Sequence, residues 1–136
     1  MRIVEGDVFE FAGEEGIILH GVTENAPAAA GFASQVNLNF VLKGEEHYGT
    51  PPGRVARVHP RVMALVTQRE YGRAEPKLIV RAFEEAQTWL QAEERAFFPL
   101  VGGGLGGLFS SQALFSIVRA VGGDPRFTLC LLEDTL

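Results

Sequence analysis

Five of the six residues from 102 to 107 are glycine, with Leu105 as the exception, and this segment is the best suited to hold a small ligand. Glycine lacks a Cβ atom and adopts positive φ freely. Its backbone therefore approaches a ligand closely and can aim successive N–H groups at one point. Such a loop between a strand and a helix binds an anion without lysine or arginine. We expect Gly102–Gly107 to hold the phosphate of a small molecule; a purely structural turn is the alternative.

The glycine pattern does not amount to either of two common nucleotide-binding motifs. G-x-G-x-x-G occurs at Gly102, Gly104 and Gly107, but a segment so rich in glycine matches it trivially. A dinucleotide fingerprint also needs an acidic residue about 20 positions further on, within a βαβ unit. Only one predicted strand follows here, and Asp124 precedes it. The P-loop pattern G-x-x-x-x-G-K-[ST] does not occur in the sequence.

A second segment of small residues, Ala26–Ala33, leads from a predicted strand into a predicted helix. Two strand-to-helix entries can face each other at the carboxyl edge of an α/β sheet, where ligands of such sheets bind. Together the two segments suit a diphosphate better than a single phosphate. An ordinary helix start with alanine propensity is the alternative for this segment.

Few titratable side chains accompany these loops. His20 ends a predicted buried strand, and we interpret it as a hydrogen-bonded structural histidine rather than a titrating one. Glu45-Glu46-His47 lacks the H-E-x-x-H spacing of zinc enzymes and is predicted to be a polar surface loop. The single cysteine, Cys130, lies in an apolar run and is expected to be buried. The sequence therefore predicts no disulfide, no metal site and no cofactor.

Composition and charge narrow the classes of function. The chain has 136 residues, 46% of them apolar and 21% charged, which predicts one packed domain over residues 1–136. The net charge of −5 argues against a broad nucleic-acid surface. Ten of the twelve cationic side chains are arginine, which suits a local anion pocket. With no signal peptide and no apolar run of about 20 residues, we expect a cytoplasmic protein without a membrane segment.

Hydrophobic patterning predicts alternating strands and helices. The predicted strands are Arg2–Glu5, Glu15–Gly21, Arg54–His59, Val62–Gln68, Phe97–Val101 and Phe127–Leu132. The predicted helices are Ala30–Leu42, Pro76–Ala96 and a third that runs to Val121 with Ser110 or Ser111 as its N-cap. Arg54–His59 and Val62–Gln68 are close enough to form a hairpin. The fold class is therefore α/β, with three α/β/α layers around a mixed, mostly parallel sheet.

Four stretches of the sequence, in order, resemble the macro domain, the ADP-ribose-binding α/β module. Val4–Val8 is similar to the family's first motif. Gly16–Ala33, ending in Ala29-Ala30-Gly31-Phe32-Ala33, is similar to its first binding loop. Leu65–Gln68 with Tyr71-Gly72-Arg73 resembles a compact phage and bacterial branch akin to terminal ADP-ribose glycohydrolases. Phe98–Gly107 is similar to the diphosphate-binding second loop.

The resemblance implies a ligand and a set of binding residues. The ligand is ADP-ribose or a related nucleotide, either free or carried by an ADP-ribosylated protein or nucleic acid, with Asp7 at the adenine amino group. The implied ligand-binding residues are Asp7, Val8, His20, Thr23, Ala30, Gly31, Phe32, Ala33, Gly102, Gly103, Gly104, Leu105, Gly106, Gly107 and Leu108.

Departures from the family pattern leave enzyme activity open. Thr23 stands where active members carry asparagine, and Ala29 replaces a glycine. The lysine nucleophile and the aspartate of the glycohydrolase branch correspond here to Gln68 and Gly106, which supply neither a Schiff base nor a general base. A hydrolase that acts on ADP-ribosyl groups or on ADP-ribose 1″-phosphate, assisted by Glu24 or His20, is one alternative. A degenerate scaffold that binds a protein partner is the other.

Overall fold

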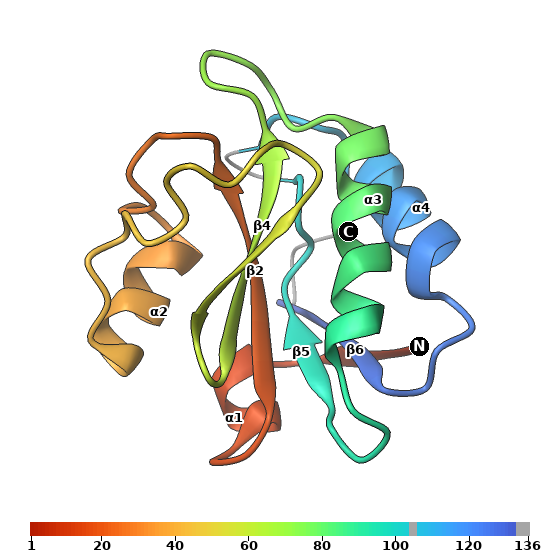
Figure 1. Ribbon diagram of the computed structural model, residues 1–136. Helices are drawn as coiled ribbons and strands as arrows, with labels where there is room; N and C mark the ends of the chain where they lie inside the picture. The colour runs from red at the N-terminus through yellow and green to blue at the C-terminus, as the bar shows by residue number, and fades with distance from the viewer. Residues whose placement is uncertain (104–105, 133–136) are drawn as a thin grey trace.

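The computed structural model describes residues 1–103 and 106–132 of the chain, and β-strands alternate with helices along most of that length (Figure 1). The described elements are β1 (Arg2–Glu5), α1 (Val8–Ala12), β2 (Ile17–Thr23), α2 (Phe32–Phe40), β3 (Val55–His59), β4 (Val62–Gln68), α3 (Pro76–Trp89), β5 (Ala96–Phe98), α4 (Ser110–Val121) and β6 (Phe127–Leu131).

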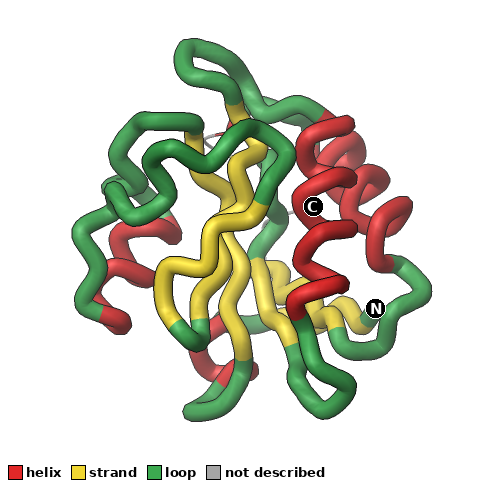
Figure 2. Tube along the Cα trace, viewed as in Figure 1, coloured by secondary structure: helices red, strands yellow, loops and turns green. Residues whose placement is uncertain are grey.

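The strands, drawn in yellow in Figure 2, form one sheet. Their order is β1-β6-β5-β2-β4-β3. Every neighbouring pair is parallel except β3 and β4, which form the predicted antiparallel hairpin. The prediction of a mixed, mostly parallel sheet is confirmed. Because five strands run in the same direction, their carboxyl ends meet at one edge of the sheet, and the loops that follow them meet there too.

Helices cover both faces of the sheet, as predicted for a three-layer fold (Figure 1). On one face, Ile79 and Phe83 of α3 and Ile117 of α4 join the main apolar core. On the other face, Val8 of α1 and Val36 of α2 pack with buried residues of β2, β4 and β6. Within the described residues, no helix combines the length and the apolar character needed to span a membrane.

The predicted boundary of the longest helix is wrong. The helix ends at Trp89 instead of continuing to Ala96, and Ala96 begins β5. The guanidinium of Arg126 explains the stop, because it donates hydrogen bonds to the carbonyl oxygens of Gln87 and Leu90 at 3.3 and 2.9 Å. A side chain 36 residues further along the chain therefore caps the end of this helix.

Two other helix starts differ from the sequence-based expectation. Helix α1 was not predicted, since five residues are too few to display a helical period. Its N-cap is Asp7, whose Oδ1 accepts a hydrogen bond from the Phe9 N–H at 2.7 Å. Helix α4 takes Phe109 as its N-cap, so the expected serine cap is wrong and Ser110 is the first helical residue.

Candidate functional site

A pocket of about 480 Å³ opens at the edge where the parallel strands end. Five segments contribute to it: the end of β2, the start of α2, the end of β4, the connection from β5 to α4, and the end of β6. The described residues that line it are His20, Gly21, Ala30, Gly31, Phe32, Ala33, Gln68, Pro99, Leu100, Val101, Gly102, Gly103, Gly106, Ser110, Cys130 and Leu132. This volume suits a small-molecule ligand.

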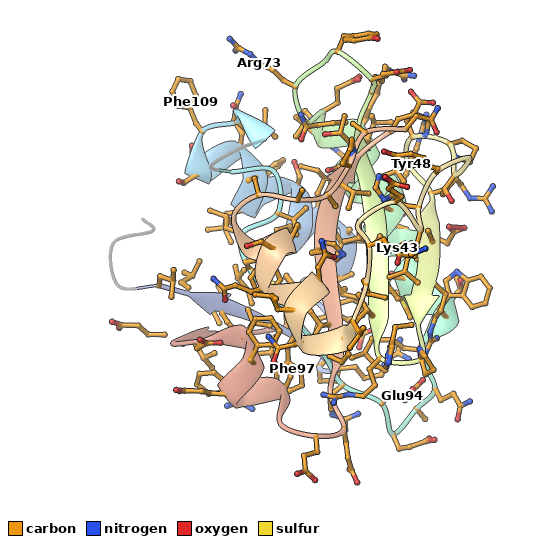
Figure 3. All side chains as sticks on the ribbon, turned by 90° about the vertical axis from the view of Figure 1, so that its left-hand side faces the viewer. Lys43, Tyr48, Arg73, Glu94, Phe97 and Phe109 are labelled. Carbon is orange, nitrogen blue, oxygen red and sulfur yellow. The ribbon has the colours of Figure 1, made fainter. Side chains whose placement is uncertain are left out.

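The orientation of the molecule can be followed in Figure 3, which views it from the side of α2. Arg73 and Phe109 lie at one end of the molecule, at which β4 and the segment after β5 lead into helices. Glu94, which comes before β5, lies at the opposite end. The pocket belongs to the first of these two ends, because its lining comes from the segments that follow the strands.

The pocket unites eight residues that the sequence analysis had assigned to ligand binding: His20, Ala30, Gly31, Phe32, Ala33, Gly102, Gly103 and Gly106. Five others do not line it: Asp7, Val8, Thr23, Gly107 and Leu108. Gly104 and Leu105 lie outside the described residues.

Sequence reasoning missed several lining residues: Gly21, Pro99, Leu100, Val101, Ser110, Cys130 and Leu132. Gln68 also lines the pocket, although the sequence analysis had considered it only as a replaced nucleophile. Gly21, Pro99, Leu100 and Val101 lie within the two segments that resemble binding loops, but they were not singled out as ligand contacts. Cys130 and Leu132 lie near the end of the last predicted strand, and Ser110 was considered only as a helix N-cap.

The start of α2 supplies unoccupied donors to this pocket. Its N-cap is Gly31, with φ of 60°, and no side chain caps the helix. The first N–H groups of a helix have no acceptor within the helix, so those of Phe32 and Ala33 remain available to a ligand. Helix α4 also starts at the pocket, through Ser110. Two helix N-termini, each with partial positive charge, therefore meet here.

The glycine loop is more self-contained than expected. Three described amides already donate within the loop: Gly103 to Leu100 O at 3.2 Å, Gly106 to Gly103 O at 3.0 Å, and Leu108 to Gly102 O at 3.0 Å. These N–H groups are not free for an anion in this conformation. The expectation that successive loop amides all converge on a ligand is therefore wrong for these three.

The pocket lining that the structure describes carries no Asp, Glu, Lys or Arg side chain. Its titratable groups are His20 and Cys130. Burial, together with the nearby His47, lowers the pKa of His20 to about 4. Burial raises the pKa of the Cys130 thiol to about 11. Both side chains are therefore uncharged near neutral pH, and the pocket offers an anion helix dipoles rather than cations.

The expected environment of His20 is wrong in one respect. The side chain is 4% exposed, as a structural histidine would be, but its Nδ1 atom is buried with no hydrogen-bond partner. An unsatisfied buried nitrogen cannot readily accept a second proton, because the resulting charge would be desolvated. The imidazole is therefore a poor general base at neutral pH. Cys130, by contrast, is buried as predicted.

The prediction of a polar surface loop holds for Glu45 and Glu46, which are exposed, but is wrong for His47. His47 is 2% exposed, and its Nε2 lies 2.9 Å from Thr23 O and 2.8 Å from Ala26 O. One ring N–H shared between two carbonyl oxygens ties this loop to the segment that follows β2. Oε1 and Oε2 of Glu46 accept hydrogen bonds from the N–H groups of Gly44 and Lys43 at 2.9 and 2.7 Å. The side chain of His47 therefore fixes this loop to the start of the small-residue segment that follows β2.

Gln68 and Gly106, which the sequence analysis aligned with the catalytic positions of the glycohydrolase branch, lie side by side. A Cβ atom built on Gly106 would be 4.0 Å from Oε1 of Gln68. Neither residue supplies a nucleophile or a base. Glu24 does not line the pocket, and its Oε1 accepts a long hydrogen bond of 3.4 Å from the Glu70 N–H. In the part of the chain that is described, no group of three or more His, Cys, Asp or Glu side chains could hold a metal ion.

Comparison with known proteins identifies the architecture. The sequence matches no protein-family model and no curated protein. Among solved structures, the macrodomain of Thermus aquaticus DarG is 18% identical, with a TM-score of 0.72 and 97% coverage of both chains. A macrodomain protein from Streptomyces coelicolor is 17% identical, with a TM-score of 0.69 and 97% coverage of both chains.

A third solved structure includes a ligand. Thermosipho africanus DarTG, determined in complex with ADP-ribose, is 18% identical, with a TM-score of 0.74. The match covers 98% of the present chain and 42% of that one. The agreement with all three structures extends over nearly the whole of the present chain. This protein therefore has the macrodomain fold.

Proposed function

We propose that the protein binds ADP-ribose, or a nucleotide that carries an ADP-ribosyl group, in the pocket at the carboxyl edge of the sheet. The observation that carries the proposal is the meeting of two helix N-termini at a pocket whose described lining has no charged side chain. The partial positive charge of the helix N-termini favours an anion, and no lining carboxylate among the described residues repels one. The structural likeness to a protein solved with ADP-ribose supports the choice of ligand.

The order of the strands supports an extended ligand. Asp7 follows β1, and the first small-residue segment follows β2, with β6 and β5 between them. Three strand spacings amount to about 14 Å, which suits a dinucleotide-sized molecule better than a single phosphate. In the proposed complex, adenine lies near Asp7 and Val8. The diphosphate lies between the α2 N-terminus and the Gly102–Gly107 loop, and the second ribose lies toward Thr23 and His20.

The proposal concerns binding rather than turnover. Within the described lining, the titratable base is His20, which is unprotonated near pH 7 but has a pKa of about 4 and is therefore a weak proton acceptor. ADP-ribose can be presented free or at the end of a modified protein or nucleic acid, and the open edge of the sheet is compatible with each.

Substitution of Phe32 tests the role of the α2 amide. Proline is well tolerated at the first helical position but has no N–H, so Phe32→Pro removes one proposed donor. The matched control is Phe32→Ala, which also loses the ring that stacks 5.3 Å from Phe9 but keeps the N–H. Since hydrogen bonds to charged groups contribute about 1.5–3 kcal/mol, Phe32→Pro should bind ADP-ribose at least about tenfold more weakly than Phe32→Ala.

The measurement is titration calorimetry of the full chain with ADP-ribose, accompanied by thermal unfolding. At a ligand concentration of 100 times Kd, the free energy of unfolding should rise by about 2.7 kcal/mol. Absence of any heat signal or thermal shift at millimolar ADP-ribose would rule out the proposed function. Equal affinities for the two Phe32 variants would be consistent with ADP-ribose as the ligand but would show that the Phe32 N–H does not bind it.

A further inference from the structure

A second hollow lies between α3 and α4. The two helices pack side by side on the same face of the sheet (Figure 1). The hollow has a volume of about 400 Å³, and its described lining residues are Pro76, Lys77, Val80, Arg81, Glu84, Phe115, Ser116 and Arg119. It shares no residue with the pocket proposed for ADP-ribose. We refer to these eight residues as the α3–α4 groove.

Charge sets the α3–α4 groove apart from the rest of this acidic chain. It contains three cationic side chains and one carboxylate, Glu84, while the whole chain has a net charge of −5. Lys77 and Arg81 are one helical turn apart, about 6 Å along α3, and Arg119 projects from the other helix. The groove is therefore a local site for negative charge spread over more than one group.

Arg81 and Arg119 differ from most arginines of this protein. Six arginines hold the fold together through hydrogen bonds to carbonyl oxygens or carboxylates: Arg54, Arg57, Arg61, Arg69, Arg95 and Arg126. Arg81 and Arg119 form no hydrogen bond or ion pair within residues 1–103 and 106–132. The nearest ion pair of Lys77 is a 3.9 Å approach to Glu75. Arg81 and Arg119 are thus available to an external partner, whereas Lys77 is shared with Glu75.

The centre of the groove is apolar. Phe115 is 66% exposed, although a ring of this size normally covers part of a core. The stem of Arg81 passes close to Gly53, because a Cβ added there would lie 3.5 Å from its Cβ and Cδ. An exposed aromatic ring beside guanidinium groups has the composition of a protein-binding surface, where Phe and Arg are enriched.

We propose that the α3–α4 groove binds an acidic peptide segment of a partner protein, with an apolar side chain over Phe115 and carboxylates at Lys77, Arg81 and Arg119. Cations that come from two helices, two of them one turn apart on α3, suit negative charges that are spaced along one chain. Three cations beside one carboxylate do not form the broad basic surface that a nucleic-acid backbone requires. A peptide with an apolar side chain between carboxylates can contact both Phe115 and the cationic side chains of the groove. Grooves formed by helices commonly bind short peptide segments through such apolar anchors.

A peptide-binding experiment on the full chain tests the proposal. The probe is a fluorescein-labelled 12-residue peptide with leucine at its centre and glutamate on both sides; the control peptide has glutamine in place of every glutamate. Fluorescence anisotropy should give an affinity about tenfold or more higher for the acidic peptide at 50 mM NaCl, falling as salt rises.

Charge-reversal variants locate the site. Arg119→Glu and Arg81→Glu should each weaken binding of the acidic peptide about tenfold, and Phe115→Ser should weaken it by loss of the apolar anchor. The matched control is Arg2→Glu, which changes the charge equally but lies on β1, outside the groove. Circular dichroism and thermal unfolding check that each variant is folded, which the exposure of these side chains leads us to expect.

The outcomes separate this proposal from competing ones. Equal affinity for the acidic and glutamine peptides, or binding unaffected by Arg81→Glu and Arg119→Glu, overturns it. Preferential binding of a 12-nucleotide oligothymidine through the same arginines also overturns it and assigns the groove to nucleic acid. Binding of ADP-ribose should be the same in groove variants and in the unaltered protein. Failure of one proposal therefore leaves the other standing.

Discussion

At the scale of the single residue, backbone geometry determines more of the candidate site than charged side chains do. Gly102 has φ of +95°, a conformation that favours glycine. A Cβ atom at this position would also lie 2.5 Å from Cδ1 of Ile79, beneath the pocket. Two independent constraints therefore require glycine here, and both concern the shape of the loop rather than its contact with a ligand.

Replacement of Gly102 by alanine should destabilise the fold more than the same change at a glycine that has space. At Gly49, φ is +86° and no atom lies within 4 Å of the place that a Cβ would take, so Gly49→Ala carries only the backbone strain of about 1–2 kcal/mol. Gly102→Ala adds the displacement of Ile79, for a total of about 3 kcal/mol. Urea unfolding of both variants measures the difference; equal losses would mean that Ile79 moves aside without cost.

The glycine cluster illustrates how far residue-level prediction reaches. Glycine content and position predicted a tight loop between a strand and a helix, because few other residues tolerate such conformations. The same content did not predict where each N–H points. Gly103 and Gly106 donate to carbonyl oxygens within their own loop, a result of the particular sequence of φ and ψ angles and not of composition.

At the scale of the element, helix ends were harder to predict than helix positions. Apolar periodicity located α3 and α4, whereas the end of α3 depends on Arg126, a residue just before β6. The same guanidinium forms an ion pair of 2.7 Å with Asp124. Its hydrogen bonds, ahead of other causes, lower the pKa of Asp124 to about 2. One partly buried side chain thus joins the end of α3 to the turn that precedes β6.

Replacement of Arg126 by methionine tests this junction. The methionine stem fills similar space but removes the guanidinium from the Gln87 and Leu90 carbonyl oxygens. The Asp124 carboxylate keeps only the backbone N–H of residue 126 and the Gln87 amide as donors. The free energy of unfolding should fall by about 2 kcal/mol. Arg95→Met is the control, because Arg95 donates only to exposed carbonyl oxygens of its own loop and should cost less than about 0.5 kcal/mol. Similar losses in the two variants would contradict the role given to Arg126.

At the scale of the whole molecule, folding brings an uncharged histidine to a pocket assembled from five segments. The pKa of His20 is lowered from 6.5 to about 4, first by desolvation and then by His47, while Glu46 acts in the opposite direction. The unfolded chain therefore takes up this proton at a higher pH than the folded chain does. Stability is full above the unfolded pKa and is lost as pH falls from about 6.5 to about 4.

The size of this pH effect can be predicted. A shift of this extent corresponds to about 3 kcal/mol of unfolding free energy lost across that window. His20→Phe removes the titrating group at similar volume, so its stability should vary less with pH between 6.5 and 4. Asp124 does not contribute to the change in stability between pH 6.5 and 4, because its stabilising effect is lost only below its unfolded pKa of 3.8. Parallel pH profiles for the two proteins, measured by urea unfolding, would show that His20 is not the group responsible.

The sequence by itself determined the α/β alternation, the hairpin of β3 and β4, and the two segments that line the pocket. These features depend on local patterns of apolar residues, glycine and small residues. Only the tertiary structure decided which of the predicted residues meet, because strand order is set by packing between segments far apart in the chain. That order puts β6 and β5 between Asp7 and the first loop, and it brings Cys130 and Ser110 to the same pocket. Burial of His47 and the unpartnered Nδ1 of His20 likewise follow from long-range contacts, for which a local pattern gives no signal.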